Sequence, residues 1–312
     1  MASWAQLHER LEGGGSDMGE ERVHKFTKGG TALERDTGIS LEEIVQGSGE
    51  DRIVHFLEFQ KERQAHKSHV KNFKTGLLQL DGLMGGFETG EMTVISGPTG
   101  NGKTLFADSI GQRLMRTEKM KIAWFSYEVP TEKMILKYVR SEDREVLPLY
   151  VPMSLKAGSY AWLKNKCLEA QLKHQCEAVF IDHLHFLVDM DTKMNISLNI
   201  GAVMRSIKHE IAKGMNLAVF VICHQGQPKD EEPALENIRD SSFIAQESDN
   251  VFIVFRSPDP LADELKPNAN IRGYQRSYDG GYATVKIEKA RREGTYRKKI
   301  HYQKLGHWLE EI

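Results

Sequence analysis

The stretch Gly97-Pro98-Thr99-Gly100-Asn101-Gly102-Lys103-Thr104 fits the pattern G-x-x-x-x-G-K-[ST], the pattern of a phosphate-binding P-loop. Residues 91–96 before it form an apolar, β-prone run that is typical of a buried strand. Apolar residues after it recur at helical spacing, at Leu105, Phe106, Ile110 and Leu114. The loop is therefore predicted to join a strand to a helix N-terminus, where backbone N–H groups and the helix dipole attract phosphate. The alternative, a glycine-rich turn with an incidental lysine, does not explain why both flanks fit.

Each fixed position of the loop has a predicted task. Gly97, Gly100 and Gly102 let the backbone wrap phosphates without clashes from Cβ atoms. Lys103 is predicted to reach the β- and γ-phosphates, and Thr104 is predicted to ligate Mg²⁺. The predicted cofactors are therefore ATP, or another nucleoside triphosphate, and Mg²⁺.

Composition limits the class of protein. The chain has 312 residues, of which 40% are apolar and 28% are charged, as in ordinary globular proteins. No apolar run approaches the ~20 residues that span a bilayer, so no membrane is expected. The formal net charge of −2 gives no global basic field, so any nucleic-acid site must be local. The three cysteines lack metal-ligand spacing and suit a reducing compartment. No targeting signal is seen. We therefore expect the protein in the cytoplasm of a bacterium or a phage-infected cell.

Three regions are expected along the chain. Residues 1–50 are polar and interrupted by glycines, which predicts a loose N-terminal tail or the end of a missing upstream domain. Residues 51–71 have a narrow apolar stripe at helical spacing. This helix is either a surface helix packed on its own domain or a linker helix that docks on a neighbouring subunit. Residues 72–312 are expected to form the nucleotide-binding domain.

Apolar segments in this domain alternate with helical patterns, which predicts an α/β fold. Strands are expected at residues 121–126, 178–182, 217–223 and 251–255. The alternation favours a mainly parallel, doubly wound sheet with the ligand site at the carboxyl ends of its strands. Residues 284–289 and 297–302 alternate like an antiparallel strand pair around a turn.

Polar residues at the predicted strand ends supply candidate chemistry. Asp182 follows four apolar residues, as does the Walker B aspartate that delivers a carboxylate to Mg²⁺. The next residue is His183 rather than Glu, so the base that activates water must come from elsewhere. Glu128 is the candidate, provided that its strand neighbours the P-loop strand; the alternative is a solvent-facing glutamate that opens a loop.

The fourth strand ends in His224-Gln225. Gln225 is predicted to hydrogen-bond a γ-phosphate, or the attacking water, and to report it to the following loop; the alternative is a helix or turn cap. His183 and His185 are expected to pack or hydrogen-bond locally rather than bind a metal, because no third ligand lies at useful spacing.

The ordered set of motifs resembles a known family. These are the P-loop, the Ser126-Tyr127-Glu128 turn, residues 181–184 and 221–225, and residues 238–242 and 246–251. The set is similar to the RecA-type core of the hexameric replicative helicases, which comprise the bacterial DnaB family, phage primase–helicases and mitochondrial Twinkle. The resemblance covers roughly residue 75 to the C-terminus. It implies an enzyme that hydrolyses NTP, translocates 5′→3′ on single-stranded DNA and unwinds duplex DNA at a replication fork.

The resemblance also implies partners and further site residues. A homo-oligomer, in the form of a hexameric ring, is expected, with a primase, a polymerase or a helicase loader as possible partners. The chain shows no zinc-binding cysteine set or primase-like region before the core, so a helicase without its own primase is expected. The resemblance implies a lumen loop that grips DNA phosphates, formed by Arg239, Asp240, Ser241 and Ser242, although the family often has Gly where Ser242 stands.

Lys289 and Arg291 match a Lys-x-Arg pair that, in the family, reaches the nucleotide of a neighbouring subunit. They point the same way if the strand continues, because side chains alternate along a strand. The alternative is a solvated basic hairpin turn.

Two other functions use the same core. One is a RecA- or KaiC-type ATPase that forms filaments or rings without unwinding DNA. The other is a P-loop phosphotransferase, which predicts an acceptor pocket and a lid; the sequence shows no sign of either. Closed rings would distinguish the helicase from a filament.

Overall fold

The computed structural model describes residues 56–58, 70–139, 146–156, 159–187, 196–225, 232–238, 241–256, 281–294, 297–305 and 308–312. The chain divides into two units, Met1–Ser68 and His69–Ile312. The tail expected at residues 1–50 lies outside the described residues. Of the helix expected at 51–71, residues 56–58 are helical, whereas Val70 and Lys71 are not, so that helix does not extend to Lys71.

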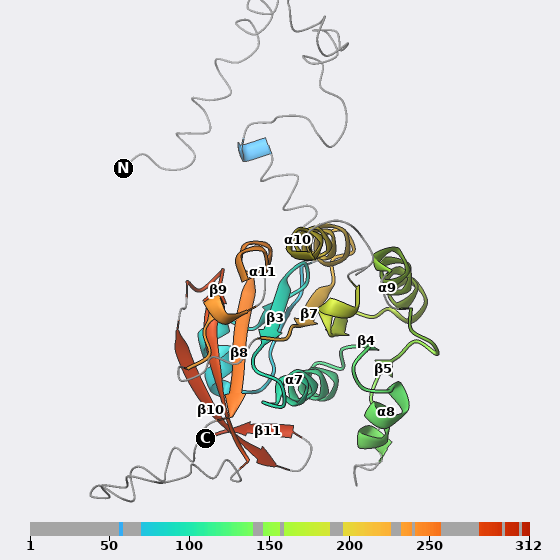
Figure 1. Cartoon of the computed structure of the whole chain (residues 1–312). Helices are drawn as coiled ribbons and strands as arrows, with labels where there is room; N and C mark the ends of the chain where they lie inside the picture. Colours follow the sequence, from blue (N-terminus) through green and yellow to red (C-terminus); the bar gives the residue numbers. More distant parts are fainter. Residues whose placement is uncertain are drawn as a thin grey trace, which may run out of the picture. The chain divides into compact units, whose positions relative to one another are not determined.

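The second unit is built on one large sheet (Figure 1). In the described part of the chain its strand order is β11-β10-β9-β8-β3-β7-β6-β4-β5. The strands from β8 to β5 are parallel. They are β3 (Met92–Ser96), β4 (Ile122–Ser126), β5 (Leu149–Tyr150), β6 (Ala178–Asp182), β7 (Ala218–Ile222) and β8 (Asn250–Arg256). Most are continuous apolar runs because helices cover both faces of a parallel sheet, and the predicted mainly parallel fold is confirmed.

The C-terminal part of the sheet is antiparallel. The predicted pair is present as β9 (Tyr282–Ala290) and β10 (Lys298–Leu305). Two features were not predicted: β9 also pairs antiparallel with β8, and a short strand β11 (Trp308–Glu311) extends the edge. A separate two-stranded sheet joins β1 (Asn72–Phe73) to β2 (Phe87–Glu88).

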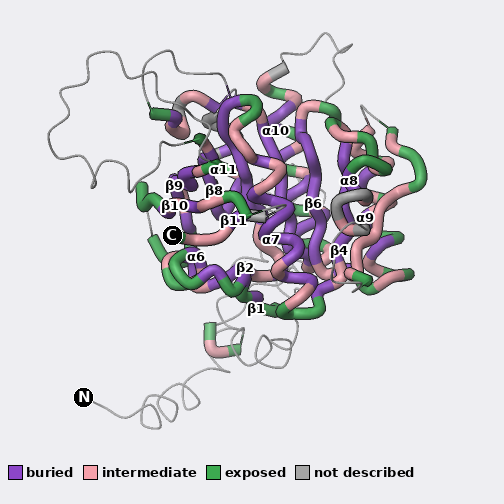
Figure 2. Tube along the Cα trace, turned by 90° about the horizontal axis from the view of Figure 1, so that it is seen from below, coloured by how far each residue is buried: buried purple, intermediate pink, exposed green. Residues whose placement is uncertain are grey.

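Helices cover both faces of the sheet. On one face, α6 (Leu78–Met84) and α7 (Lys103–Thr117) contribute to one apolar core. On the other, α9 (Tyr160–His174), α10 (Ile196–Ser206), η3 (Ile207–Lys213) and α11 (Ser241–Glu247) contribute to a second core. Figure 2 shows that the strand between them, β6, is buried along its length. The remaining described helices are α8 (Thr131–Val139), η2 (Leu184–Leu187) and η4 (Leu235–Asn237).

The apolar residues Ile200, Val203, Met204, Ile207 and Ile211 recur at helical spacing, and they lie on a continuous helix that ends before Gly214. It is not a single α-helix: α10 passes into η3, which has π-helical hydrogen bonding. A π-helical turn inserts an extra residue per turn, which a pattern of apolar spacing does not reveal.

An aromatic stack fixes the P-loop helix on the sheet. Trp124, Phe180 and Phe220 are register partners on β4, β6 and β7, and their rings stack with centroids 4.5 and 4.4 Å apart. A Cβ atom at Gly111 of α7 would lie 3.3 Å from the Trp124 ring, so α7 packs closely on the stack. Each fully buried aromatic side chain stabilises the fold by roughly 1.5–3 kcal/mol.

The strand order places β4 farther from the P-loop strand than expected. Glu128 was expected to reach the phosphates if β4 neighboured β3, but β7 and β6 lie between these two strands. The carboxyl ends of β3, β7, β6 and β4 therefore lie next to one another in this order, and a polar residue stands at or just after each of them.

Candidate nucleotide site

The P-loop joins β3 to α7 through two glycines that no other residue would replace easily. Gly97 has φ +146°, and a Cβ atom there would lie 2.0 Å from the carbonyl oxygen of Val254 on β8. Gly102 caps α7 in the left-handed region, with φ +97°. The loop backbone is thus held at the start of α7, where its N–H groups can face an anion.

Lys103 lies across the loop and is 5% exposed. Its ammonium group donates a hydrogen bond to the carbonyl oxygen of Pro98 at 3.0 Å. Burial lowers the pKa of Lys103, while the carboxylates of Glu128 and Asp182 oppose that shift. An ammonium group has three N–H donors, so Lys103 can bond Pro98 and still donate hydrogen bonds to a phosphate.

Thr104 and Asp182 meet at the base of the loop. The Thr104 hydroxyl donates a hydrogen bond to Oδ2 of Asp182 at 3.0 Å. Asp182 ends β6 and is fully buried. A hydroxyl and a carboxylate are hard oxygen donors of the kind that Mg²⁺ prefers, so these two residues fit the predicted ion.

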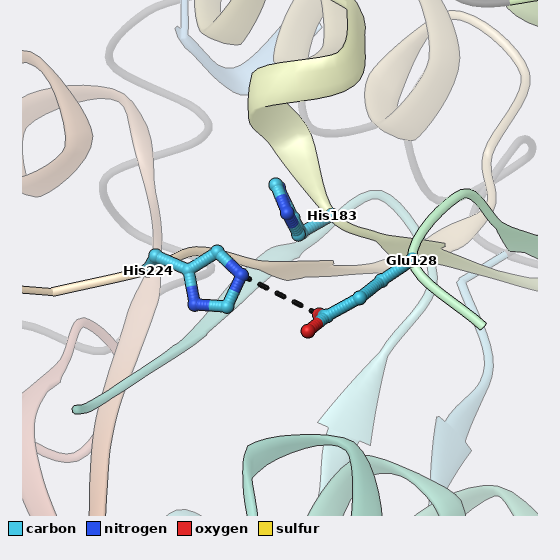
Figure 3. A group of neighbouring side chains, drawn as sticks. All are labelled: Glu128, His183 and His224. Atoms are coloured by element: carbon cyan, nitrogen blue, oxygen red, sulfur yellow. Dashed lines mark ion pairs between the residues drawn. The ribbon is translucent and has the colours of Figure 1, made fainter. Parts of the chain in front are cut away.

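Glu128 reaches the same edge from β4. Its backbone N–H donates to the carbonyl oxygen of Asp182 at 3.2 Å, which places the glutamate beside the end of β6. Its carboxylate lies 3.4 Å from Nε2 of His224, at the end of β7 (Figure 3), and its side chain is 40% exposed. The carboxylate is therefore both anchored by its neighbours and open to water.

Two histidines line the space beside Glu128. The rings of His183 and His224 have centroids 4.1 Å apart. Burial is the main reason that the pKa of His183 falls to about 3 and that the pKa of His224 is lowered, with the charge of Lys103 contributing to both shifts. His183 is therefore neutral at physiological pH.

This cluster contradicts one expectation from the sequence. No third ligand was expected near His183, yet ligand atoms of Glu128, His183 and His224 lie within 4.8 Å of one another. Sequence spacing fails here because each residue follows a different strand. The available signal was that all three stand at the ends of predicted strands.

Gln225 is placed differently from its neighbour His224. It is 5% exposed, and its side-chain amide donates to the carbonyl oxygen of Ala234 at 3.1 Å. Its backbone forms an antiparallel bridge with Ile238. Gln225 thus links the end of β7 to residues 234–238, while His224 is the side chain beside Glu128.

The residues expected to contact DNA are only partly described. Arg239 and Asp240 lie outside the described residues, and Ser241 and Ser242 begin α11. Their expected role therefore remains a prediction.

Lys289 and Arg291 lie toward the amino-terminal ends of the parallel strands, whereas the P-loop follows the carboxyl end of β3. Strand pairing aligns the end of β9 with the start of β8 and hence with the start of β3. Lys289 is level with Val251 of β8 and therefore with Val94, two residues before the end of β3, and Arg291 lies one residue beyond Ala290, which is level with Thr93. At ~3.3 Å per residue, Lys289 is roughly 7 Å and Arg291 more than about 10 Å back from the end of the P-loop strand. Lys289 donates to the carbonyl oxygen of Ser248 at 2.6 Å, and Arg291 lies 3.3 Å from Oδ1 of Asp249.

Within the described residues, the helices are too short or too polar to cross a membrane.

Comparison with known proteins identifies relatives of this arrangement. The model of the family described as "DnaB-like helicase C terminal domain" matches residues 72–148 and 146–307. The chain is 22% identical over 247 residues to "Replicative DNA helicase DnaB" of Rickettsia prowazekii, covering 64% of the chain and 50% of the relative. It is 23% identical over 256 residues to the protein of that name from Treponema pallidum, covering 72% and 56%. The chain thus spans about half the length of the curated relatives it matches.

Two solved structures have the same fold. One is a separate ATPase domain; it has a TM-score of 0.62 and 14% identity, with 82% of this chain and 97% of that chain covered. The other, "The Structure Of A DnaB-Like Replicative Helicase And Its Interactions With Primase", has the same score and identity and covers 98% of this chain and 76% of that chain. The RecA-type architecture, the P-loop edge and the extent of the family match agree: this chain belongs to the family of the DnaB-like helicase C-terminal domain.

Proposed function

We propose that the protein is an NTP-driven helicase that translocates 5′→3′ on single-stranded DNA and unwinds duplex DNA at a replication fork. The observation that carries this proposal is the contact between Thr104 and Asp182 at the base of the P-loop. It brings a hydroxyl and a carboxylate from distant parts of the chain together where Mg²⁺-nucleotide hydrolysis needs them.

The residues at the carboxyl ends of the parallel strands have different proposed roles in hydrolysis. Backbone N–H groups of the P-loop and the Lys103 ammonium group would bind the phosphates, and Thr104 with Asp182 would hold Mg²⁺. When bound, Mg²⁺ neutralises charge that develops on the phosphates. Glu128, half-exposed beside these residues, orients the attacking water and accepts its proton.

Lys289 and Arg291 complete a neighbouring site in this proposal. Lys289 bonds the carbonyl oxygen of Ser248 and Arg291 pairs with Asp249, both before the start of β8, whereas their own P-loop follows the opposite end of the parallel strands. Arg291 has a side chain that is 67% exposed and is therefore available to another subunit. Head-to-tail contacts of this kind form closed rings or open filaments, and in this proposal they close into a homo-hexamer with a shared site at each interface.

Contact with DNA is assigned to the segment 239–242. The bond from Gln225 to Ala234 supports a route by which the nucleotide site acts on that segment. A primase is a proposed partner, since a related structure is named for its interactions with one, and a polymerase and a loader are further candidates. Because the named relatives are bacterial, we place the protein in the cytoplasm of a bacterium or an infected host cell.

Strand separation on a labelled forked duplex tests this function. The full chain with Mg²⁺ and ATP should displace the strand when the fork carries a 5′ tail, and should not when only a 3′ tail is present. Negative-stain images with nucleotide and single-stranded DNA should show closed rings. Open filaments without strand displacement would replace the helicase by a filament-forming ATPase.

A further inference from the structure

A second cluster of ligand atoms stands beside the predicted Mg²⁺ residues. Glu128, His183 and His224 come from the ends of three different strands, and Figure 3 shows their side chains converging on one space. One ligand atom from each lies within 4.8 Å of the other two. The function proposed above assigns a role to Glu128 but none to the imidazoles of His183 and His224.

The geometry suits a transition metal rather than Mg²⁺. Two ligands that are each ~2.1 Å from a tetrahedral ion lie roughly 3.4 Å apart. Oε2 of Glu128 and Nε2 of His224 are 3.4 Å apart. Two imidazoles and one carboxylate form a known zinc ligand set that leaves a fourth position open, whereas Mg²⁺ prefers oxygen ligands.

Both imidazoles have a ring nitrogen at the cluster. His183 is 8% exposed, and its ring centroid lies 4.1 Å from that of His224, so the two imidazoles stand together beside the carboxylate of Glu128. Among the described residues, Nδ1 of His183 and Nδ1 of His224 are buried and have no hydrogen-bond partner. No protein hydrogen bond at these atoms therefore prevents either ring from turning toward an ion.

We propose that Glu128, His183 and His224 form a binding site for Zn²⁺ or a similar divalent transition metal, separate from the Mg²⁺ site of Thr104 and Asp182. The bound ion inhibits hydrolysis, because a glutamate that ligates a metal no longer accepts a proton from water. The binding site stands on geometry alone; the inhibition rests on the role proposed for Glu128.

Titration of the nucleotide-free full chain with Co²⁺ tests the site without using hydrolysis. Co²⁺ bound by nitrogen and oxygen in tetrahedral geometry gives visible absorption bands, and Zn²⁺ should remove them by displacement. His183→Gln and His224→Gln should each weaken Co²⁺ binding at least ~10-fold. Loss of a residue that only hydrogen-bonds a metal ligand already costs about that much affinity, so loss of a ligand should cost no less. His185→Gln is the matched control, since His185 is a neighbouring histidine outside the cluster, and it should bind as the parent does.

The possible outcomes test metal binding and the inhibition of hydrolysis separately. Absence of bands, bands that excess Mg²⁺ removes, or bands unchanged in both His183→Gln and His224→Gln would overturn the site. Nucleotide binding by each variant shows that it has folded. In excess Mg²⁺-nucleotide, Zn²⁺ should slow hydrolysis by the parent more than by His224→Gln; bound metal without such inhibition would overturn the inhibitory role and leave the site standing.

Discussion

The hydroxyl of Thr104 donates a hydrogen bond to Oδ2 of Asp182 at 3.0 Å, across 78 residues of sequence. Thr104 lies in the first turn of α7, and Asp182 ends β6, which is separated from the P-loop strand by β7. The contact therefore depends on the whole strand order β3-β7-β6. It joins the loop that is proposed to bind phosphate to the carboxylate that is proposed to hold the ion.

Asp182→Asn should abolish Mg²⁺-dependent hydrolysis while leaving the fold intact. The amide keeps the size of the side chain and can still accept the Thr104 bond, but it removes the negative charge that attracts the cation. A metal ion contributes several kcal/mol to the transition state, so turnover should fall at least ~100-fold. Steady-state hydrolysis across Mg²⁺ concentrations measures this effect, and thermal unfolding provides the control. Turnover within a few-fold of the parent would remove Asp182 from the ion site.

Glu128→Gln should bind nucleotide and assemble, but hydrolyse it about 10²-fold more slowly or worse, within the usual range for a general base. The reason is that an amide cannot accept the proton of the attacking water. Glu132→Gln is a matched control, because Glu132 is exposed on α8, four residues away. Normal turnover in Glu128→Gln, together with an essential acidic residue elsewhere, would show that the base has been misassigned.

Much of this edge could be predicted from sequence, for a physical reason. The P-loop and the Walker B strand are local patterns in which spacing fixes the chemistry, and the structure brings Thr104 and Asp182 together as those patterns indicate. Strand order is set by long-range packing instead, so the insertion of β7 and β6 between β3 and β4 was not foreseen. His224 was missed beside Glu128 for the same reason, because no local pattern records which strand ends become neighbours.

Arg291→Ala should bind nucleotide and assemble, yet fail to hydrolyse, because its guanidinium group is proposed to act on the nucleotide of a neighbour. A finger acting in trans is worth ~10³–10⁵ in turnover. Lys298→Ala, an exposed lysine of the same hairpin, should retain activity. Mixing Arg291→Ala with Lys103→Ala should restore part of the hydrolysis, because some interfaces then pair an intact P-loop with an intact finger. If co-assembled mixtures stay inactive, Arg291 does not act in trans.

Lys208→Met should destabilise the fold. Lys208 is 3% exposed, pairs with Asp249, and donates to the carbonyl oxygen of Gly90 at 3.1 Å. Asp249 also accepts a hydrogen bond from the backbone N–H of Met92, at the start of the P-loop strand. Removing one partner of a buried ion pair costs about 3–5 kcal/mol. Denaturant unfolding should show this loss, whereas Lys213→Met, at an exposed position of the same π-helix, should change stability by less than ~1 kcal/mol.

The most direct test of the central claim is the rate of ATP hydrolysis by the parent chain and by Lys103→Ala, each with and without single-stranded DNA. Lys103 is the buried cation of the P-loop, and it donates a hydrogen bond to the carbonyl oxygen of Pro98. The parent should hydrolyse ATP faster when DNA is present, and Lys103→Ala should bind nucleotide weakly and show no hydrolysis in either condition. Near-normal turnover in Lys103→Ala, or a parent rate that DNA leaves unchanged, would contradict a DNA-driven motor powered by this loop.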